Sequence, residues 1–147
     1  MKYLAMILTI FLTDDQIKSI VERGNGKERL ILFKSIRLRK YHNKGIAFDV
    51  FENIQPMVAA VSAALSVLLG IGLYDGIKKG APTGKKMGLA MMLGGALSNT
   101  LDRLKRHYVT DYFSFNFGGK KLKQIVFNIS DFFILIGAII TTWYSEK

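Results

Sequence analysis

The sequence predicts an all-α membrane protein, a bundle of four transmembrane helices with a small β-sheet in its first long loop. Half of the 147 residues are hydrophobic, and the longest apolar runs carry almost no charge. The 21 basic and 11 acidic residues, a net charge of +10, are gathered in blocks between those runs. Such blocks are typical of membrane proteins, whereas a soluble basic protein usually spreads its charge along the chain. The length suggests one domain, residues 1–147.

Four apolar stretches predict the four helices. Residues 53–74 are 22 uncharged residues, which as a helix measure ~33 Å and cross a hydrocarbon core of ~30 Å. Residues 124–144 contain a single acid, and residues 87–101 contain no charge. The first stretch continues past two acids with apolar residues at helical spacing. We therefore expect helices over about 3–22, 56–74, 87–105 and 126–144.

The connections differ in character. Residues 75–86 form a short linker with a Gly-Ala-Pro-Thr-Gly turn, which joins two antiparallel helices. The loop over about 23–55 is longer, and apolar residues nearly alternate along residues 30–38 after a glycine-rich turn at Gly24. This pattern predicts a small amphipathic sheet on the membrane surface.

The other long loop, over about 106–125, lies on the same side of the bundle. Its Gly118-Gly119 pair predicts a turn between two strand-like pieces, residues 112–117 and 122–127.

The composition narrows the chemistry. The chain has no cysteine, which excludes disulfides, thiol nucleophiles and cysteine metal sites. With only His42 and His107, a multi-histidine metal site is not expected either. We expect no cofactor, no metal and no nucleic-acid partner.

Counting the spans brings the acids together. Helices alternate in direction, so the end of the first, the start of the second, the end of the third and the start of the fourth lie on one side. Both long loops lie there too. The residues expected to converge at this end are Asp14, Asp15, Asn43, Asp102, Asp111 and Asp131.

Two of these acids follow an asparagine at the same spacing, Asn99 before Asp102 and Asn128 before Asp131. Residues three apart share a helix face, so each amide can donate to its carboxylate or to a substrate. An acid in or near the membrane is costly and tends to face a cavity or a partner. The structural alternatives are ion pairs with neighbouring arginines, a favourable helix N-terminus for Asp131, and pairing of Asp14 or Asp15 with Lys18.

Two aspartates that share a pocket indicate aspartic hydrolysis. Like charges a few ångström apart do not easily both ionise, so one carboxyl keeps a proton. The ionised one acts as general base on a water, and the other polarises the scissile carbonyl and protonates the leaving amine.

The same residues resemble the motifs of signal peptidase II, the bacterial lipoprotein signal peptidase. The order and spacing hold from about residue 10 to 140. The matching segments are Gly-Gly-Ala-Leu-Ser-Asn-Thr-Leu-Asp-Arg over residues 94–103, Val-Thr-Asp-Tyr over 109–112, Phe-Asn-Ile-Ser-Asp over 127–131, Asn-Lys-Gly-Ile-Ala-Phe over 43–48, and Asp14 followed by Lys18.

The resemblance implies residue roles and partners. Asp111 and Asp131 are the implied catalytic pair. It implies a prolipoprotein substrate with a diacylglyceryl-modified cysteine, cut on the N-terminal side of that cysteine, and membrane lipid and cyclic-peptide inhibitors as further partners. It also implies an extracytoplasmic sheet in the first loop. The residues implied to shape the pocket or hold substrate are Asn43, Asn99, Asp102, Arg103, Asn128, Asp14 and Lys18.

Three positions within the matching segments depart from the family motifs, and Gln124-Ile125-Val126 stands where the family often has Trp-Pro. Ile17 stands for a threonine, and Ile46 and Ser130 each stand for an alanine. None of them removes a proposed catalytic acid. The alternative is a paralogue on the same fold that is non-catalytic, such as an assembly or immunity factor, or is directed to another membrane peptide. A small transporter with a proton relay is disfavoured because the acids gather on one side.

Two arguments disagree on which side of the membrane the motif-bearing loops lie. The motif-bearing loops hold more lysine and arginine than the 75–86 linker, and the positive-inside rule places such loops in the cytoplasm. The resemblance places them outside, and we follow it because its motifs are specific. We therefore expect a multi-pass protein of the bacterial cytoplasmic (inner) membrane with its active site on the extracytoplasmic side.

Overall fold

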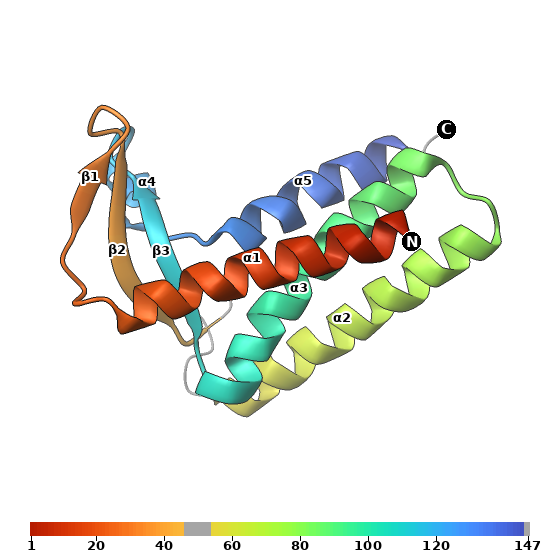
Figure 1. Cartoon of the computed structure of the whole chain (residues 1–147), viewed down its shortest axis with the longest axis horizontal. Coiled ribbons are helices and arrows are strands. Elements are labelled where there is room, and N and C mark those ends of the chain that lie inside the picture. The colour runs from red at the N-terminus through yellow and green to blue at the C-terminus, as the bar shows by residue number, and fades with distance from the viewer. Residues whose placement is uncertain (46–53, 146–147) are drawn as a thin grey trace.

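The computed structural model describes residues 1–45 and 54–145. Within these ranges, four long helices run back and forth along the molecule, and a small sheet lies across one end of them (Figure 1). The N-terminus, the end of α5 and the α2–α3 turn lie at the opposite end (Figure 1). The long helices are α1 (Lys2–Arg23), α2 (Gln55–Lys78), α3 (Thr83–Arg106) and α5 (Ile129–Trp143).

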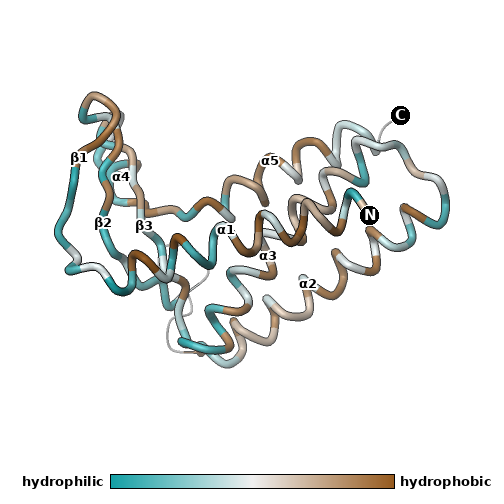
Figure 2. Tube along the Cα trace, in the orientation of Figure 1, coloured by the Kyte–Doolittle hydropathy of each residue, from teal (hydrophilic) through white to brown (hydrophobic). Residues whose placement is uncertain are grey.

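The helices lie where the apolar stretches predict them, with shifted ends. α2 runs on to Lys78, past the predicted residue 74, and α3 begins at Thr83, before the predicted residue 87. The fourth begins at Ile129 rather than at 126, because Phe127 pairs with Phe113 in an isolated bridge and Asn128 caps the helix. Among the described helices, α2 is long and apolar enough to cross a membrane by itself, and α5 is apolar but has 15 residues. Figure 2 shows hydrophilic segments at the sheet end and around the α2–α3 turn.

The sheet draws its strands from both long loops. β1 (Arg29–Ile31) and β2 (Ile36–Asn43) come from the first loop, as predicted, and β3 (Val109–Phe115) comes from the second. The strands are antiparallel in the order β1-β2-β3, with an irregularity in β2 between Leu38 and Tyr41. The sheet therefore ties the loop after α1 to the loop after α3.

The expectation of a strand over residues 122–127 is wrong. A short helix, α4 (Lys120–Gln124), stands there instead, and its residues are largely exposed. Only Phe127 pairs with the sheet, since its backbone N–H donates to the carbonyl of Phe113 at 2.7 Å.

α3 is the central helix, because α1, α2 and α5 each pack against it. Small residues allow the closest approach. A Cβ added to Gly95 would lie 2.6 Å from the carbonyl oxygen of Ser130 on α5, so only glycine fits this crossing. The crossing brings the polar end of α3 against the first turn of α5.

Candidate active site

The residues predicted to converge do lie together at the sheet end of the bundle. Asp14, Asp102, Asp111 and Asn128 are almost fully buried there, from α1, α3, β3 and the cap of α5. Asn43, Asp131 and Asp15 are partly exposed, and Asp15 faces away from its buried neighbour Asp14 on α1. A cluster of this polarity inside an apolar bundle requires partners for every charge.

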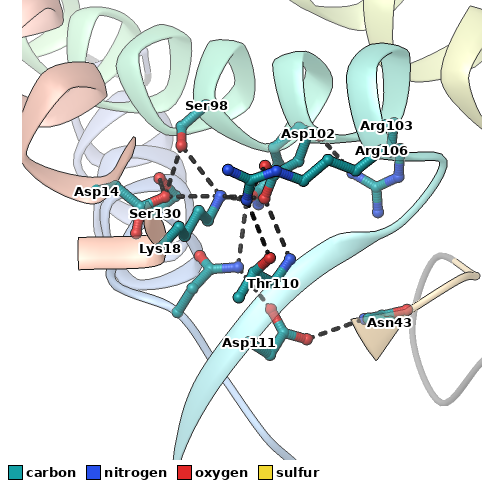
Figure 3. Close-up of polar contacts among 12 residues, drawn as sticks. Asp14, Lys18, Asn43, Ser98, Asp102, Arg103, Arg106, Thr110, Asp111 and Ser130 are labelled. Atoms are coloured by element: carbon teal, nitrogen blue, oxygen red, sulfur yellow. Dashed lines mark hydrogen bonds and ion pairs between the residues drawn. The ribbon is translucent and has the colours of Figure 1, made fainter. Parts of the chain in front are cut away.

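Asp111 on β3 is 2% exposed and accepts two amide donors. Its Oδ1 accepts from Asn128 Nδ2 at 2.6 Å, and its Oδ2 accepts from Asn43 Nδ2 at 3.2 Å (Figure 3). Asn43 is held in turn, because its Oδ1 accepts the backbone N–H of Gly45 at 3.1 Å. The sheet therefore presents Asp111 with both oxygens occupied by neutral donors.

Asp131 lies in the first turn of α5, within a capping box. Its backbone N–H donates to Asn128 Oδ1 at 3.0 Å, and its Oδ2 accepts the backbone N–H of Asn128 at 3.1 Å. A capping box joins the N-cap residue to the residue three positions later, which is the spacing of Asn128 and Asp131 in the sequence. Its Oδ1 accepts from Asn99 Nδ2 at 3.0 Å.

The two amides are fixed in orientation by donors to their oxygens. Asn99 Oδ1 accepts from Lys18 Nζ at 2.8 Å and from Asn128 Nδ2 at 3.2 Å, so its NH₂ group faces Asp131. Asn128 Oδ1 is taken by the N–H of Asp131, so its NH₂ group faces Asp111. Asn128 thus joins the two aspartates, which lie on β3 and α5, through one side chain.

A second, deeper layer centres on Asp14 and Lys18, which are both fully buried. The predicted pairing along α1 is present, with Lys18 Nζ 2.8 Å from Asp14 Oδ2, and the same ammonium lies 3.2 Å from Asp102 Oδ2 (Figure 3). Asp102 also pairs with Arg106 at 3.0 Å, as one structural alternative predicted.

Asp14 collects three hydroxyl donors besides the ammonium. Ser98 and Ser130 each donate to its Oδ2 at 2.6 Å, and the hydroxyl of Tyr112 donates to its Oδ1 at 2.9 Å. This layer connects α1, α3, β3 and α5 directly beneath the aspartate pair. Ser130, a departure from the family motif, therefore has a defined partner here.

The sequence assigns no role to several residues of the site, although Thr110 and Tyr112 lie within a matching segment. Tyr112 accepts the backbone N–H of Ile129 at 2.9 Å, and so joins the start of α5 to Asp14. Glu22, at the end of α1, accepts from Thr110 Oγ1 at 2.7 Å and lies 2.9 Å from His42 Nε2. These contacts depend on the docking of the sheet onto α1, which no local spacing predicts.

Arg103 lines the site from α3. Its guanidinium donates to the carbonyls of Gly45 at 3.2 Å and Asn99 at 3.4 Å. It thereby ties the chain just after β2 to the helix that carries Asn99. Ile46 and the rest of the segment that begins at Asn43 lie outside the described residues.

The environment of Asp111 favours a proton. Burial, and next the negative charge of Asp131, raise the pKa of Asp111 to about 7, while its bonds from Asn43 and Asn128 oppose the rise. A carboxyl whose pKa is raised by a neighbouring carboxylate is the setting in which two acids can share one proton.

A buried carboxyl, Asp111, linked through Asn128 to the helix turn that carries Asp131, at the polar end of an apolar helical bundle, is an arrangement typical of an aspartic hydrolase that works in a membrane. The family model for "Signal peptidase (SPase) II" matches residues 6–146, nearly the whole chain. The chain belongs to the signal peptidase II family and is therefore an aspartic peptidase of the bacterial inner membrane. The resemblance seen in the sequence is confirmed.

Relatives named lipoprotein signal peptidase support this membership. The one from Mesorhizobium japonicum is 30% identical over 96% of this chain and 83% of its own length. The one from Moorella thermoacetica is 29% identical over 97% of this chain and 91% of its own. A shorter match to that of Caldanaerobacter subterraneus is 48% identical but covers 35% of this chain and 32% of the relative.

Two solved structures share the fold. Both are described as bacterial membrane enzymes solved by the in meso method, at 2.3 and 1.9 Å resolution. The first superposes with a TM-score of 0.79 at 20% identity over 95% of this chain and 84% of its own. The second gives 0.78 at 19% identity over 97% and 90%.

Proposed function

We propose that this chain removes the signal peptide from diacylglyceryl-modified prolipoproteins, cutting N-terminal to the lipidated cysteine, with Asp111 and Asp131 as its catalytic pair. The observation that carries the proposal is the single side chain of Asn128, which donates to Asp111 and caps the helix turn that holds Asp131. Family membership and the relatives' names support the substrate class.

The two carboxyls take different roles because their surroundings differ. Asp131 accepts a backbone N–H in the first turn of α5, where the helix dipole favours an anion, so we assign it the general base. Asp111, whose pKa is raised to about 7, holds the proton.

The reaction then proceeds by addition of water to the scissile carbonyl. Asp131 takes a proton from the water as its oxygen attacks the carbonyl carbon. Asp111 gives its proton to the carbonyl oxygen, which yields a neutral tetrahedral diol. As the diol collapses, the C–N bond breaks and Asp131 passes its proton to the leaving nitrogen. Asp111 recovers a proton from the hydroxyl that becomes the carbonyl oxygen of the new carboxylic acid.

The bundle is proposed to lie across the membrane as one domain with four spans. Apolar side chains are exposed on α2 and on the outer faces of α1 and α5, as lipid-facing surfaces require. Examples are Leu8 on α1, Leu68 on α2 and Ile139 on α5. The polar site lies at the sheet end, and the family resemblance assigns that end to the extracytoplasmic side.

Asn43 and Arg103 are proposed to meet the substrate or the family's cyclic-peptide inhibitors. Arg103 donates to the carbonyl of Gly45, two residues after Asn43. Asn43 itself donates to Asp111, a proposed catalytic acid. Asn99, Asp102, Asn128, Asp14 and Lys18 are proposed to position the pair.

The test is processing of a purified diacylglyceryl-modified precursor in detergent, read as a gel shift. Asp111→Asn and Asp131→Asn should each abolish cleavage, because the pair needs one base and one acid. Asp75→Asn is the matched control, since Asp75 is half exposed near the α2–α3 turn and pairs with Lys79. Full activity in either site variant would overturn the assignment of the pair.

The alternative of a non-catalytic or redirected paralogue is tested in the same assay. A wild-type chain that folds but leaves the lipidated precursor intact would favour that alternative. An unmodified precursor, run in parallel, shows whether cleavage requires the lipid.

A further inference from the structure

A cavity separate from the aspartate pair lies between the last turns of α1 and the sheet. Its volume is about 490 Å³. Tyr112 lines it, and Asp111, the next residue along β3, points to the opposite face of the strand. The ring of Tyr112 therefore lies between this cavity and the buried polar layer around Asp14, to which its hydroxyl donates.

The inner surface of the cavity is aliphatic. Ile17, Ile20 and Val21 contribute from α1 and Leu38 from β2, beside the ring of Tyr112. Ile20 is 66% exposed, a large apolar side chain left open at the mouth of a cavity. Such a lining accepts a hydrocarbon chain in preference to a polar ligand.

The rim of the cavity is basic. Lys27, Arg29, Arg39 and Lys40 line it, and no carboxylate does among the described residues. Arg39 donates to the backbone carbonyls of Lys123 and Gln124 and Lys40 to those of Glu22 and Gly24, so their cationic groups have protein partners.

Lys27 and Arg29 differ from the other two cations. Both are exposed, and the structure gives their cationic groups no partner among the described residues. Glu28, between them in the sequence, pairs with Arg37 at 3.5 Å, and Glu22 pairs with Lys40 and lies against His42. Two cations at the rim are therefore available to an anion from outside the chain.

We propose that this cavity binds one anionic phospholipid of the surrounding bilayer, with an acyl chain along the aliphatic lining and its phosphate at Lys27 and Arg29. The proposal rests on the proposed placement of α1 across the membrane, which puts its last turn and this rim at headgroup depth. It does not rest on the peptidase activity. A diacylglyceryl group without a phosphate would leave the basic rim unused, so the bound lipid is distinct from the substrate's own lipid.

The test is native mass spectrometry of the full chain, released from detergent after mixing with equal amounts of phosphatidylglycerol and phosphatidylcholine of the same acyl chains. Wild type should carry one phosphatidylglycerol in clear preference. Each cation near an anionic headgroup changes binding by roughly fivefold. Lys27→Gln with Arg29→Gln should therefore reduce the preference by about tenfold or more.

The matched control is Lys120→Gln with Lys121→Gln, two exposed lysines of α4 that do not line the cavity. It removes the same charge from the same end of the molecule and should keep the preference. Equal losses in both double variants would overturn the site in favour of diffuse attraction, and an unchanged preference in the Lys27/Arg29 variant would also overturn it. Competition by millimolar glycerol phosphate, which has no acyl chain, would show that a free phosphate site and not a lipid site is present.

Discussion

The fully buried ammonium of Lys18 on α1 lies 2.8 Å from the side-chain amide oxygen of Asn99 on α3. An amide whose oxygen accepts from a cation must turn its NH₂ group elsewhere, and here it turns to Asp131 at 3.0 Å. A residue of α1 that touches neither proposed catalytic acid by hydrogen bond thereby fixes a donor to one of them.

Lys18→Met keeps the length of the side chain and removes its charge. Asp14 is left buried without a counter-ion, and Asp102 keeps Arg106 as its remaining cation, so the expected loss of stability is about 3–5 kcal/mol. Asn99 also loses the contact that orients it, and peptidase activity should fall with it. Thermal unfolding in detergent and the gel-shift assay measure the two effects.

The matched control for this change is Lys79→Met. Lys79 also pairs with an aspartate four residues away, Asp75, but the two side chains are 71% and 50% exposed. An exposed pair contributes roughly 0–1 kcal/mol, so this variant should unfold close to wild type. Equal melting temperatures of Lys18→Met and Lys79→Met would show that the burial of Lys18 does not contribute to stability.

Ser130→Ala restores the alanine of the family motif. It removes one of four donors to Asp14 and leaves Ser98, Tyr112 and Lys18 in place, so the expected loss of stability is about 1 kcal/mol, with activity retained. A loss of activity without a change in melting would instead give Ser130 a part in the chemistry.

Tyr112→Phe should be more costly than Ser130→Ala in the same melting series. The hydroxyl of Tyr112 both donates to Asp14 and accepts the backbone N–H of Ile129, so its removal leaves a donor and an acceptor short of a partner. We expect a loss of about 2–3 kcal/mol, because unpaired buried groups cost more than a removed bond. The ring itself stays, so a milder effect than that of Ser130→Ala would contradict the bridging role of the hydroxyl.

Much of the site follows from local rules that the sequence displays. The three-residue spacing of Asn128 and Asp131 predicts a shared helix face, and the capping box realises it. Counting apolar runs brings Asp14 and Asp102 to the same end, where Lys18 joins them. Each of these inferences uses one helix or the alternation of helices, which periodicity makes visible.

The rest depends on contacts between segments far apart in the chain. β3 completes a sheet that the first loop alone was expected to form, and this pairing places Asn43 beside Asp111. The contacts of Glu22 and Tyr112 arise only once that sheet has docked on α1. The stretch over residues 122–127 shows a similar limit, since its apolar residues suit a strand but α4 and one bridge form instead.

The raised pKa of Asp111 predicts how activity depends on pH. The proposed acid is protonated below about pH 7 and ionises above it, so kcat/KM should fall on the alkaline side with a midpoint near that value. The profile, taken with the lipidated precursor, belongs to the coupled pair. A flat profile to pH 9 would remove Asp111 as the acid.

The same pKa predicts how stability depends on pH. The folded chain holds a proton on Asp111 up to about pH 7, whereas an unfolded aspartate releases it near pH 4, so the folded state binds more protons in this window. Stability from this group is therefore present at low pH and falls as pH rises from about 4 to 7. Asp111→Asn does not titrate, and its melting temperature should decline less than that of wild type over this range, while Asp75→Asn should follow wild type.

Gly95 sets how closely α3 approaches α5, and Gly95→Ala tests whether that approach matters for the site. The added Cβ would lie 2.6 Å from the carbonyl oxygen of Ser130, so the helices must separate at the turn that holds Asp131. We expect a loss of about 1–3 kcal/mol from overpacking, and a larger loss of activity, because the bond from Asn99 to Asp131 crosses this gap. The control is Gly72→Ala, where the nearest atom stands 4.0 Å away and alanine should stabilise the helix by roughly 0.5–1 kcal/mol. Thermal unfolding and precursor processing are measured for both variants. Wild-type activity in Gly95→Ala would show that the proposed catalytic pair tolerates a wider separation of α3 and α5.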